Sequence, residues 1–322
     1  SLVPHLKRGQ LVVIESTIYP GTTEEIVKPI LESSGQKAGT DFFLAHCPER
    51  IDPGNRTWTL EKIPRVLGAV SREGAEKAAA FYRSIIKVDV LLLSSLKAAE
   101  ATKIMENSFR DVNIAFINEM AMSFDKADID VLEVIRGAST KPFGFMPHYP
   151  GCGVGGHCIP VDPYYLIEKA KSVGFDHAFL KLARKINNGM PAFTVALLEQ
   201  ALESKGLKKD SIVVGVYGLA YKADVDDIRE SPSKAIIALL KEKGIPHHVF
   251  DPYISQDSHV DTLDALLEKC DVLLIVTDHK EIRGITPAFC KEKKIVAVID
   301  GRNCLDKDAF RKSDIYHKGI GR

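Results

Sequence analysis

The sequence lacks an excess of either charge, because 43 lysine and arginine residues are balanced by 43 aspartate and glutamate residues. A balanced chain has no global field that draws it to nucleic acid or to an anionic membrane. Long hydrophobic runs are also missing: residues 88–93 form one of the longest, and it contains Asp89. A membrane-spanning helix needs about 20 apolar residues. Because no basic segment followed by an apolar core marks a secretory signal, we predict a cytoplasmic protein with no nucleic-acid or membrane partner.

The sequence also lacks a C-x-x-C pair. In a cytosolic chain of this size, scattered cysteines favour free thiols over a disulfide framework. The cysteines are Cys47, Cys152, Cys158, Cys270, Cys290 and Cys304.

What is present is the composition of a soluble globular protein, with 45% hydrophobic and 27% charged residues. The 322 residues exceed a single ordinary core, so two or three domains are expected. Short apolar runs alternate with helical patterns near both ends of the chain, which is the signature of doubly wound α/β layers. Thr22 followed by Glu25 predicts a capping box at the first helix. Strands are predicted at residues 11–14, 42–45, 66–70, 88–93, 212–216, 248–250, 272–276 and 295–299, and helices at 22–32, 73–85, 233–243 and 263–269.

Between these layers the sequence is helical. Apolar residues recur at steps of three and four from Ala101 to Met120, which predicts a long amphipathic helix. Further helices are predicted at residues 131–136, 164–173 and 179–204. Long helices of this kind can pair across a two-fold axis, so we expect a homodimer or a higher homo-oligomer.

One expected motif is missing: no G-x-G-x-x-G with its following helix occurs among the first strands. We therefore predict two Rossmann-like doubly wound units, the first incomplete, joined by a helical middle domain. The expected boundaries are 1–94 for the back half of a nucleotide-binding domain, 95–205 for the middle domain and 206–322 for the second α/β domain. The fragment G-V-Y-G at residues 215–218 matches only part of a dinucleotide fingerprint, so nucleotide binding there stays open.

The most informative segment is P-G-C-G-V-G-G-H-C-I-P-V-D-P-Y-Y at residues 150–165. Its glycines let the backbone approach a ligand closely, and adjacent amide donors can activate the Cys158 thiol as a thiolate. Asp162 follows four residues later, near enough to act on a proton or a water. One alternative is a structural turn with a buried cysteine. Another is a zinc site from His148, Cys152, His157 and Cys158, although these spacings do not match structural zinc sites and no metal is expected.

This segment resembles the catalytic cysteine loop of the UDP-glucose/UDP-N-acetylhexosamine 6-dehydrogenase family. Other segments agree with that family in order: E-S-T-I-Y-P-G at 15–21, C-P-E-R at 47–50, E-A-T-K-I-M-E-N at 100–107, G-L-A-Y-K at 218–222, R-E-S-P at 229–232 and D-G-R at 300–302. The resemblance covers essentially the whole chain, and the ordered set is more specific than any one motif.

Lys103 and Asn107 lie four residues apart on a predicted helix, so their side chains share one face. An ammonium and an amide are suitable donors for a developing oxyanion, although such a pair can equally be a solvated surface stripe. The resemblance aligns them with the family's catalytic lysine and asparagine, which also contact substrate.

The resemblance implies roles for further residues. Glu49 lies at the sugar and nicotinamide end and handles a water together with Thr17, while Asp162 orders or deprotonates water. The cofactor contacts are Ser16, Thr17, Ile18 and Arg229, and the remaining substrate contacts are Arg50, Gly153, Gly155, Tyr221, Lys222 and Arg302. Lysine and arginine complement the charge of a diphosphate.

The family's chemistry is a four-electron oxidation of a sugar C6 alcohol to a carboxylate with two NAD. The cysteine captures the intermediate aldehyde as a thiohemiacetal, which can lose a second hydride, and water hydrolyses the resulting thioester. Residues 49–54 and 140–145 resemble the branch that acts on UDP-N-acetylglucosamine or UDP-N-acetylmannosamine. The UDP-glucose branch carries another glutamate near the position of Pro53, so UDP-glucose ranks third.

Two alternatives remain open. The chain could be a UDP-sugar-binding or dimerisation module without catalysis, or a different cysteine enzyme such as an aldehyde dehydrogenase or a thiol hydrolase. The second alternative is disfavoured because no histidine pairs with Cys158 in a recognisable triad order. Because the glycine-rich turn and acidic residue that hold the adenosine half of NAD are not found, we expect little turnover from the chain as written.

Overall fold

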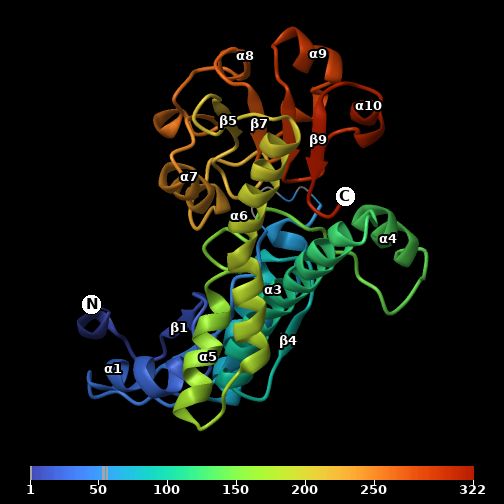
Figure 1. The fold of residues 1–322 in the computed structure, drawn as a ribbon. Coiled ribbons are helices and arrows are strands. Elements are labelled where there is room, and N and C mark those ends of the chain that lie inside the picture. Colours follow the sequence, from blue (N-terminus) through green and yellow to red (C-terminus); the bar gives the residue numbers. More distant parts are fainter. Residues whose placement is uncertain (1, 53–54, 56) are drawn as a thin grey trace. The chain divides into compact units, whose positions relative to one another are not determined.

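The structure, a computed structural model, describes residues 2–52, 55 and 57–322. The chain forms two compact units, each made of two stretches of sequence (Figure 1). The first unit comprises Ser1–Phe109 and Val161–Ala178, and the second comprises Arg110–Pro160 and Phe179–Arg322.

The first unit contains a four-stranded sheet in the order β1-β2-β3-β4. Strands β1 and β2 are parallel, β2 and β3 are antiparallel, and β3 and β4 are parallel. The strands are β1 (Leu11–Ile14), β2 (Phe43–His46), β3 (Arg65–Ala69) and β4 (Val90–Leu92). The prediction of strands in these places is confirmed, but the antiparallel step makes the sheet mixed.

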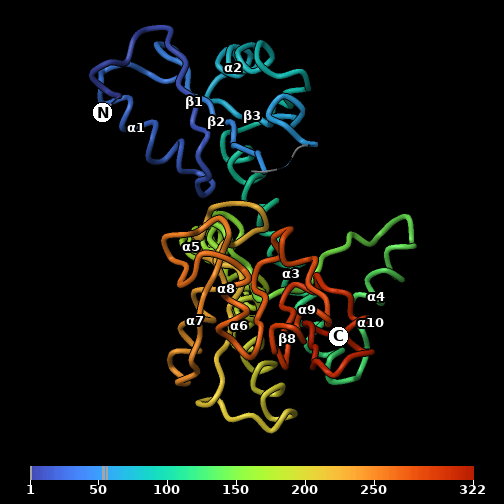
Figure 2. The backbone as a smooth tube through the Cα atoms, turned by 90° about the horizontal axis from the view of Figure 1, so that it is seen from above, coloured from blue at the N-terminus to red at the C-terminus, as the bar shows by residue number. Residues whose placement is uncertain are grey.

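Alternation along the strands gives this sheet two buried faces. Val12 and Leu44 join the cluster that includes Leu31 of α1 (Lys28–Glu32). Their neighbours Val13 and Ala45 pack on the other face with residues of α2 (Arg72–Ile85). Figure 2 shows α1 and α2 on opposite sides of β1 and β2. Ser71 caps α2 by accepting a hydrogen bond from the Gly74 amide.

Four helices lie between the two sheets in sequence. The long helix α3 (Leu96–Lys126) and the shorter α5 (Asp162–Ser172) agree with the predicted helices to within a few residues. The other two are α4 (Val131–Ala138) and α6 (Ala178–Ser204), and α6 contains Pro191 in its interior.

The second unit contains a parallel five-stranded sheet in the order β6-β5-β7-β8-β9. Numbered from its own first strand this is 2-1-3-4-5, the flavodoxin-like order, whose switch point lies between β5 and β7. The strands are β5 (Val214–Tyr217), β6 (His247–Phe250), β7 (Val272–Ile275), β8 (Ala297–Asp300) and β9 (Tyr316–Gly319).

Alternating residues of these strands again pack on two faces. Val214 and Val216 lie in one cluster with residues of α6 and α7 (Pro232–Glu242). Tyr217 and Ile275 lie in the other, with residues of α8 (Leu263–Leu267), α9 (Pro287–Glu292) and α10 (Lys307–Arg311). This three-layer arrangement confirms the predicted doubly wound second unit (Figure 1).

Some local predictions are wrong. The predicted capping box at Thr22 does not form: the Thr22 hydroxyl donates to the Tyr19 carbonyl instead. The Glu100 carboxylate from α3 accepts the amides of Gly21 and Thr23, at 2.5 and 2.8 Å, and the segment begins as a π-helix at Thr23–Val27. A partner that lies 79 residues away in sequence thus replaces the local cap. Sequence patterns also missed β9, α9 and α10.

Among the described residues, no helix combines the length and the apolar composition needed to cross a bilayer.

Candidate active site

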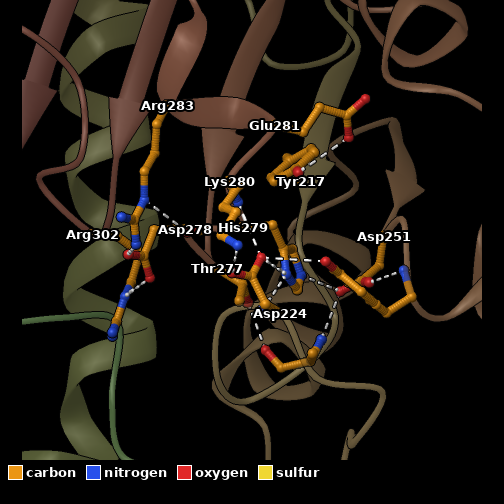
Figure 3. Close-up of polar contacts among 12 residues, drawn as sticks. Tyr217, Asp224, Asp251, Thr277, Asp278, His279, Lys280, Glu281, Arg283 and Arg302 are labelled. Atoms are coloured by element: carbon orange, nitrogen blue, oxygen red, sulfur yellow. Dashed lines mark hydrogen bonds and ion pairs between the residues drawn. The ribbon is translucent and has the colours of Figure 1, made fainter. Parts of the chain in front are cut away.

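The carboxyl ends of the parallel strands β5, β7 and β8 meet at one edge of the sheet in the second unit. Ligands of open α/β sheets bind at such an edge, beside the switch point. Arg302 follows β8, and its Nε donates to the Asp278 carboxylate at 3.3 Å. Arg283 Nη2 donates to the same carboxylate at 2.7 Å, as Figure 3 shows. Arg302 and Arg283 thus bring two guanidinium groups to this edge, and guanidinium groups are suited to binding an anion.

The partial dinucleotide fingerprint ends in a turn whose amides are already occupied. Gly218 has φ +98, and a side chain there would meet Thr277. The next two amides, of Leu219 and Ala220, donate to Asp251 Oδ2 at 2.6 and 2.8 Å. In a dinucleotide-binding unit such amides receive a phosphate. Here the chain's own carboxylate fills that position, so this turn is built differently from a dinucleotide-binding turn.

The segment that carries Cys158 is fixed to the second unit at three points. The Gly151 amide donates to Asn118 Oδ1 at 3.0 Å. The buried Cys152 thiol donates to the Gly301 carbonyl at 3.5 Å, so it anchors the loop at the end of β8. The Gly156 amide donates to the Arg229 carbonyl at 3.0 Å.

The glycines of this loop are needed because other segments of the same unit approach them closely. A Cβ on Gly155 would lie 2.6 Å from Tyr221 Cβ, and one on Gly151 would lie 2.6 Å from Arg302 Nη1. Gly153 and Gly156 have φ +139 and +90, which larger residues rarely adopt. Gly153 and Gly155 were predicted to admit a ligand. In the structure their open sides face Pro232 and Tyr221.

Cys158 is half-buried, two residues after the last of these anchors. Arg229 donates to the Asp227 carboxylate through Nε and Nη2, at 3.0 and 2.6 Å. The pKa of Arg229 is raised chiefly by this hydrogen bond, and the Cys158 thiol, when ionised, adds to the effect. A nearby cation favours the thiolate form of a cysteine. The bond from the Gly156 amide to the Arg229 carbonyl brings the segment that carries Cys158 into contact with the segment that carries Arg229.

A pocket of about 350 Å³ lies beside the cysteine loop. It is lined by the loop, by α6 and by the start of α7. Its polar lining includes Arg184, Asn187, Asn188, Glu230 and Lys234.

In the first unit, Glu49 and Arg50 follow β2. Glu49 Oε2 lies 2.9 Å from Arg65 Nη2, and its Oε1 accepts the amides of Arg50 and Ile51. Burial raises the pKa of Glu49, but the Arg65 hydrogen bond and the two amides outweigh burial, so the net pKa is lowered. An ionised carboxylate held in this way is suited to ordering a water and is a weak base. Arg50 forms a two-point ion pair with Glu106 of α3, at 2.6 and 3.3 Å.

Lys103, Asn107 and Asp162 also belong to the first unit. Asn107 Nδ2 donates to Asp162 Oδ2 at 2.5 Å, and both side chains are buried. This contact joins α3 to the start of α5 and brings together two residues that were predicted to be catalytic. Lys103 is half-buried one helical turn before Asn107.

Ser16, Thr17 and Ile18 follow β1 after Glu15; Ser16 is exposed, and Thr17 and Ile18 are half-buried. Strands β1 and β2 are parallel, so these residues and Glu49 leave the sheet at the same carboxyl edge. The preceding Glu15 accepts a hydrogen bond from the Tyr82 hydroxyl at 2.6 Å. An accessible edge with hydroxyl groups fits the nucleotide cofactor expected from the sequence. The prediction that UDP-glucose ranks third depends on the absence of a second glutamate near Pro53, and Pro53 lies outside the described residues.

The sequence did not predict several buried polar residues that hold the segments of the candidate site in position. Asn118, Asp251 and His279 are fully buried polar residues, and each contacts a site segment. A buried polar group needs a partner, but the partners are remote in sequence. Gly151 is 33 residues from Asn118, and Asp251 is 28 residues from His279.

Comparison with known proteins gives matches along the whole chain. Residues 1–86 match the NAD binding domain of the UDP-glucose/GDP-mannose dehydrogenase family, residues 97–189 its central domain and residues 215–307 its UDP binding domain. The expectation of an incomplete first unit is therefore only partly confirmed.

Similar proteins are named as dehydrogenases of UDP-linked N-acetylated sugars. The chain is 39% identical to UDP-N-acetyl-D-mannosamine dehydrogenase of Pyrococcus horikoshii over 98% of this chain and 74% of the relative. It is 42% identical to UDP-N-acetyl-D-glucosamine 6-dehydrogenase of Pseudomonas aeruginosa over 78% of this chain and 60% of the relative. The solved structure of the P. horikoshii UDP-D-ManNAc dehydrogenase superposes with a TM-score of 0.92 at 38% identity, covering 100% of this chain and 75% of that one.

Proposed function

Because this chain belongs to the UDP-glucose/GDP-mannose dehydrogenase family, we propose that it oxidises the C6 alcohol of a UDP-sugar to a carboxylate. NAD, when bound, accepts a hydride at each of two oxidation steps. The observation that carries the proposal is the cysteine loop, which is anchored by Cys152 and Gly156 to the carboxyl edge of the sheet in the UDP binding domain. A nucleophile on that edge stands where a sheet of this type binds ligands.

The proposed substrates are UDP-N-acetylmannosamine and UDP-N-acetylglucosamine. Relatives with these two names match the chain at 39% and 42% identity. UDP-glucose is a third candidate.

The proposed chemistry assigns Cys158 as the nucleophile. Its thiolate sulfur forms a bond to the C6 aldehyde carbon, the carbonyl electrons move to oxygen, and a thiohemiacetal results after that oxygen gains a proton. Oxidation of the thiohemiacetal gives a thioester, and water then releases the acid and the thiol. Lys103 and Asn107 are assigned to the developing oxyanion. Asp162, Glu49 and Thr17 are assigned to the water.

Binding roles follow from the positions of the remaining residues. Arg302, Tyr221 and Lys222 are proposed to hold the UDP group, with Gly153 and Gly155 shaping the loop beside it. Ser16, Thr17 and Ile18 are proposed to contact NAD from the end of β1, and Arg229 is proposed to reach the cofactor. Arg50 is proposed to support the sugar from its ion pair with Glu106.

The domain boundaries 1–94, 95–205 and 206–322 are likewise a proposal. They are supported by the three family matches, which end or begin near the same places. A cytoplasmic location is proposed because all six cysteines are free thiols, as expected in a reducing compartment.

We also propose that two chains associate through the middle helices. Met105 and Phe116 on α3 and Phe179 on α6 have exposed fractions of 71%, 52% and 66%. Met105, Phe109 and Phe116 are spaced by four and seven residues, so they share one face of α3. Exposed apolar residues aligned in this way are typical of a helix that packs against a partner.

The deciding experiment follows NAD reduction by this protein with each of the three UDP-sugars. The expected result is two NADH per sugar consumed, with an N-acetylated sugar preferred. Cys158→Ser should form no acid while still binding UDP. Acid formation by Cys158→Ser would exclude the covalent mechanism. UDP binding without NAD reduction would favour the binding-module alternative.

A further inference from the structure

His279 lies in the segment that follows β7, at the switch point of the second sheet, and is 1% exposed. The Asp224 amide donates to its Nδ1 at 2.9 Å. An amide can only donate, so Nδ1 must be the accepting nitrogen. The proton of the neutral ring is therefore on Nε2, which lies 3.0 Å from Asp251 Oδ2 and donates to it. Hydrogen bonding thus selects one tautomer.

The ring of His279 is also held by its aromatic neighbours. The Tyr253 ring lies 4.9 Å from it, centroid to centroid, and the Tyr217 ring lies 5.9 Å from it. Figure 3 shows His279 between Asp224 and Asp251, with Tyr217 nearby.

Asp251 and His279 together fix both ends of the segment from Leu219 to Asp224. Asp251 holds the first end through the amides of Leu219 and Ala220. His279 holds the other end through the Asp224 amide. The Asp224 backbone is in the left-handed region, with φ 60, a conformation that surrounding contacts must maintain.

Two of those contacts reach the Asp224 carboxylate. Its Oδ1 accepts the Lys280 amide at 3.1 Å and the Tyr253 hydroxyl at 3.3 Å. The end of the segment is therefore tied to the residues that follow β6 and β7.

Tyr221 and Lys222 lie between the two fixed ends. Tyr221 is also the residue against which Gly155 and Gly156 of the cysteine loop pack. Whatever fixes the segment therefore sets the positions of two proposed UDP contacts and of one wall of the cysteine loop.

We propose that His279 is a positioning residue for substrate binding. It holds the segment 219–224 in the conformation that receives the diphosphate of the UDP-sugar, through a bond donated to Asp251 and a bond accepted from Asp224. The nature of the ligand rests on the proposed function, whereas the fixing of the segment rests on the contacts alone.

Histidine is suited to this place because one ring nitrogen accepts while the other donates. Asparagine can place an accepting oxygen near the Nδ1 position, and glutamine can place a donating nitrogen near the Nε2 position. His279→Asn should therefore retain the Asp224 bond, and His279→Gln should retain the Asp251 bond. His279→Leu loses both.

The experiment titrates the 322-residue chain and its variants with UDP by calorimetry and with uridine by NMR. If the binding conformation falls to about one tenth of the population in His279→Leu, its affinity for UDP falls about tenfold. His279→Asn and His279→Gln should lose less. Uridine binding should stay unchanged, because the segment serves the diphosphate. The control is His259→Asn, since His259 lies in the same unit beside His247 and His248.

Unchanged UDP affinity in a folded His279→Leu would overturn the inference, and so would an equal loss for UDP and uridine, which indicates a general structural role. Hydrogen exchange of the Leu219, Ala220 and Asp224 amides provides a test without ligand. These amides should exchange faster in His279→Leu than in the His259→Asn control, and equal rates would overturn the inference. If the parent chain binds no UDP, the proposed function fails, and the exchange rates still decide whether His279 fixes the segment.

Discussion

At the scale of single residues, the cysteines differ in the physical environment of their thiols. Burial raises the pKa of Cys47 and Cys152 to about 11 and the pKa of Cys270 to about 12. Cys158 lies on the same glycine-rich loop as Cys152 but is half-buried, and it interacts electrostatically with Arg229. Only the thiolate is a strong nucleophile, so reactivity at neutral pH should be concentrated at Cys158.

We predict that iodoacetamide at neutral pH alkylates Cys158 before the other thiols. Peptide mapping by mass spectrometry after short exposure measures the order of modification. Arg229→Met removes the nearby positive charge and should slow alkylation several-fold. Lys269→Met, which removes a lysine charge from an exposed position elsewhere in the same unit, is the control. Earlier modification of Cys304, the other half-buried thiol, would contradict this assignment.

How far each residue could be predicted depends on where its partners lie in the sequence. Cys158 and the glycines around it are adjacent, so the motif itself carries the chemistry. Lys103 and Asn107 are one helical turn apart and could be paired by periodicity. The contact between Asn107 and Asp162 spans 55 residues. The two hydrogen bonds that Asp251 accepts from the Leu219 and Ala220 amides depend on which strands pair. No local pattern encodes such contacts, so these partners emerged only from the fold.

At the scale of elements, a buried polar chain joins α3 and α6 to the cysteine loop. Arg184 of α6 pairs with Asp111 of α3 at 2.5 Å. Asn187 donates to Asp111 Oδ1 at 2.8 Å and accepts from Asn118 at 2.9 Å. Asn118 in turn holds the Gly151 amide. The periodicity of α3 and α6 could be predicted, but these polar residues interrupt the apolar pattern, and only the packing of the two helices explains them.

We predict that Arg184→Met destabilises the second unit by about 3–5 kcal/mol, because it leaves the Asp111 carboxylate buried without its main counter-charge. Burial raises the pKa of Asp111 against the opposing effect of Arg184, so loss of Arg184 should raise that pKa further. Urea unfolding measures the free energy. The double variant Arg184→Met with Asp111→Leu should recover most of the loss, and a purely additive loss would argue against a coupled pair.

At the scale of the whole molecule, acid stability follows from two buried aspartates in the second unit. Burial raises the pKa of Asp251, but bonds from His279 and backbone amides outweigh it, and the net pKa is lowered from 3.8. The pKa of Asp300 is also lowered: burial raises it, but His317 and the amides of Leu305 and Cys304 lower it by more. A lowered folded-state pKa means that the stabilisation is complete above the unfolded-state value. It is lost as pH falls through the folded-state value.

We therefore predict that the second unit loses stability steeply below about pH 4. Asp251→Asn should be less stable than the parent at pH 7, because an amide in place of the carboxylate cannot accept every donor around it. The difference between the two proteins should shrink as the pH is lowered through the same window. Urea unfolding at pH 7 and pH 3 measures it, and a difference independent of pH would show that the charge of Asp251 contributes little.

The exposed apolar face of α3 also predicts a property of the whole molecule, namely that two chains associate. Phe116→Glu places a charge in the apolar face of α3, and burying an unpaired charge in an interface costs several kcal/mol. We expect this variant to elute at half the mass of the parent in light scattering coupled to size exclusion. Val173→Glu, which changes an apolar residue that is 73% exposed at the end of α5, should leave the mass unchanged. If the parent chain is already a monomer at micromolar concentration, the proposed dimer does not form. The apolar face of α3 would then contact a different partner.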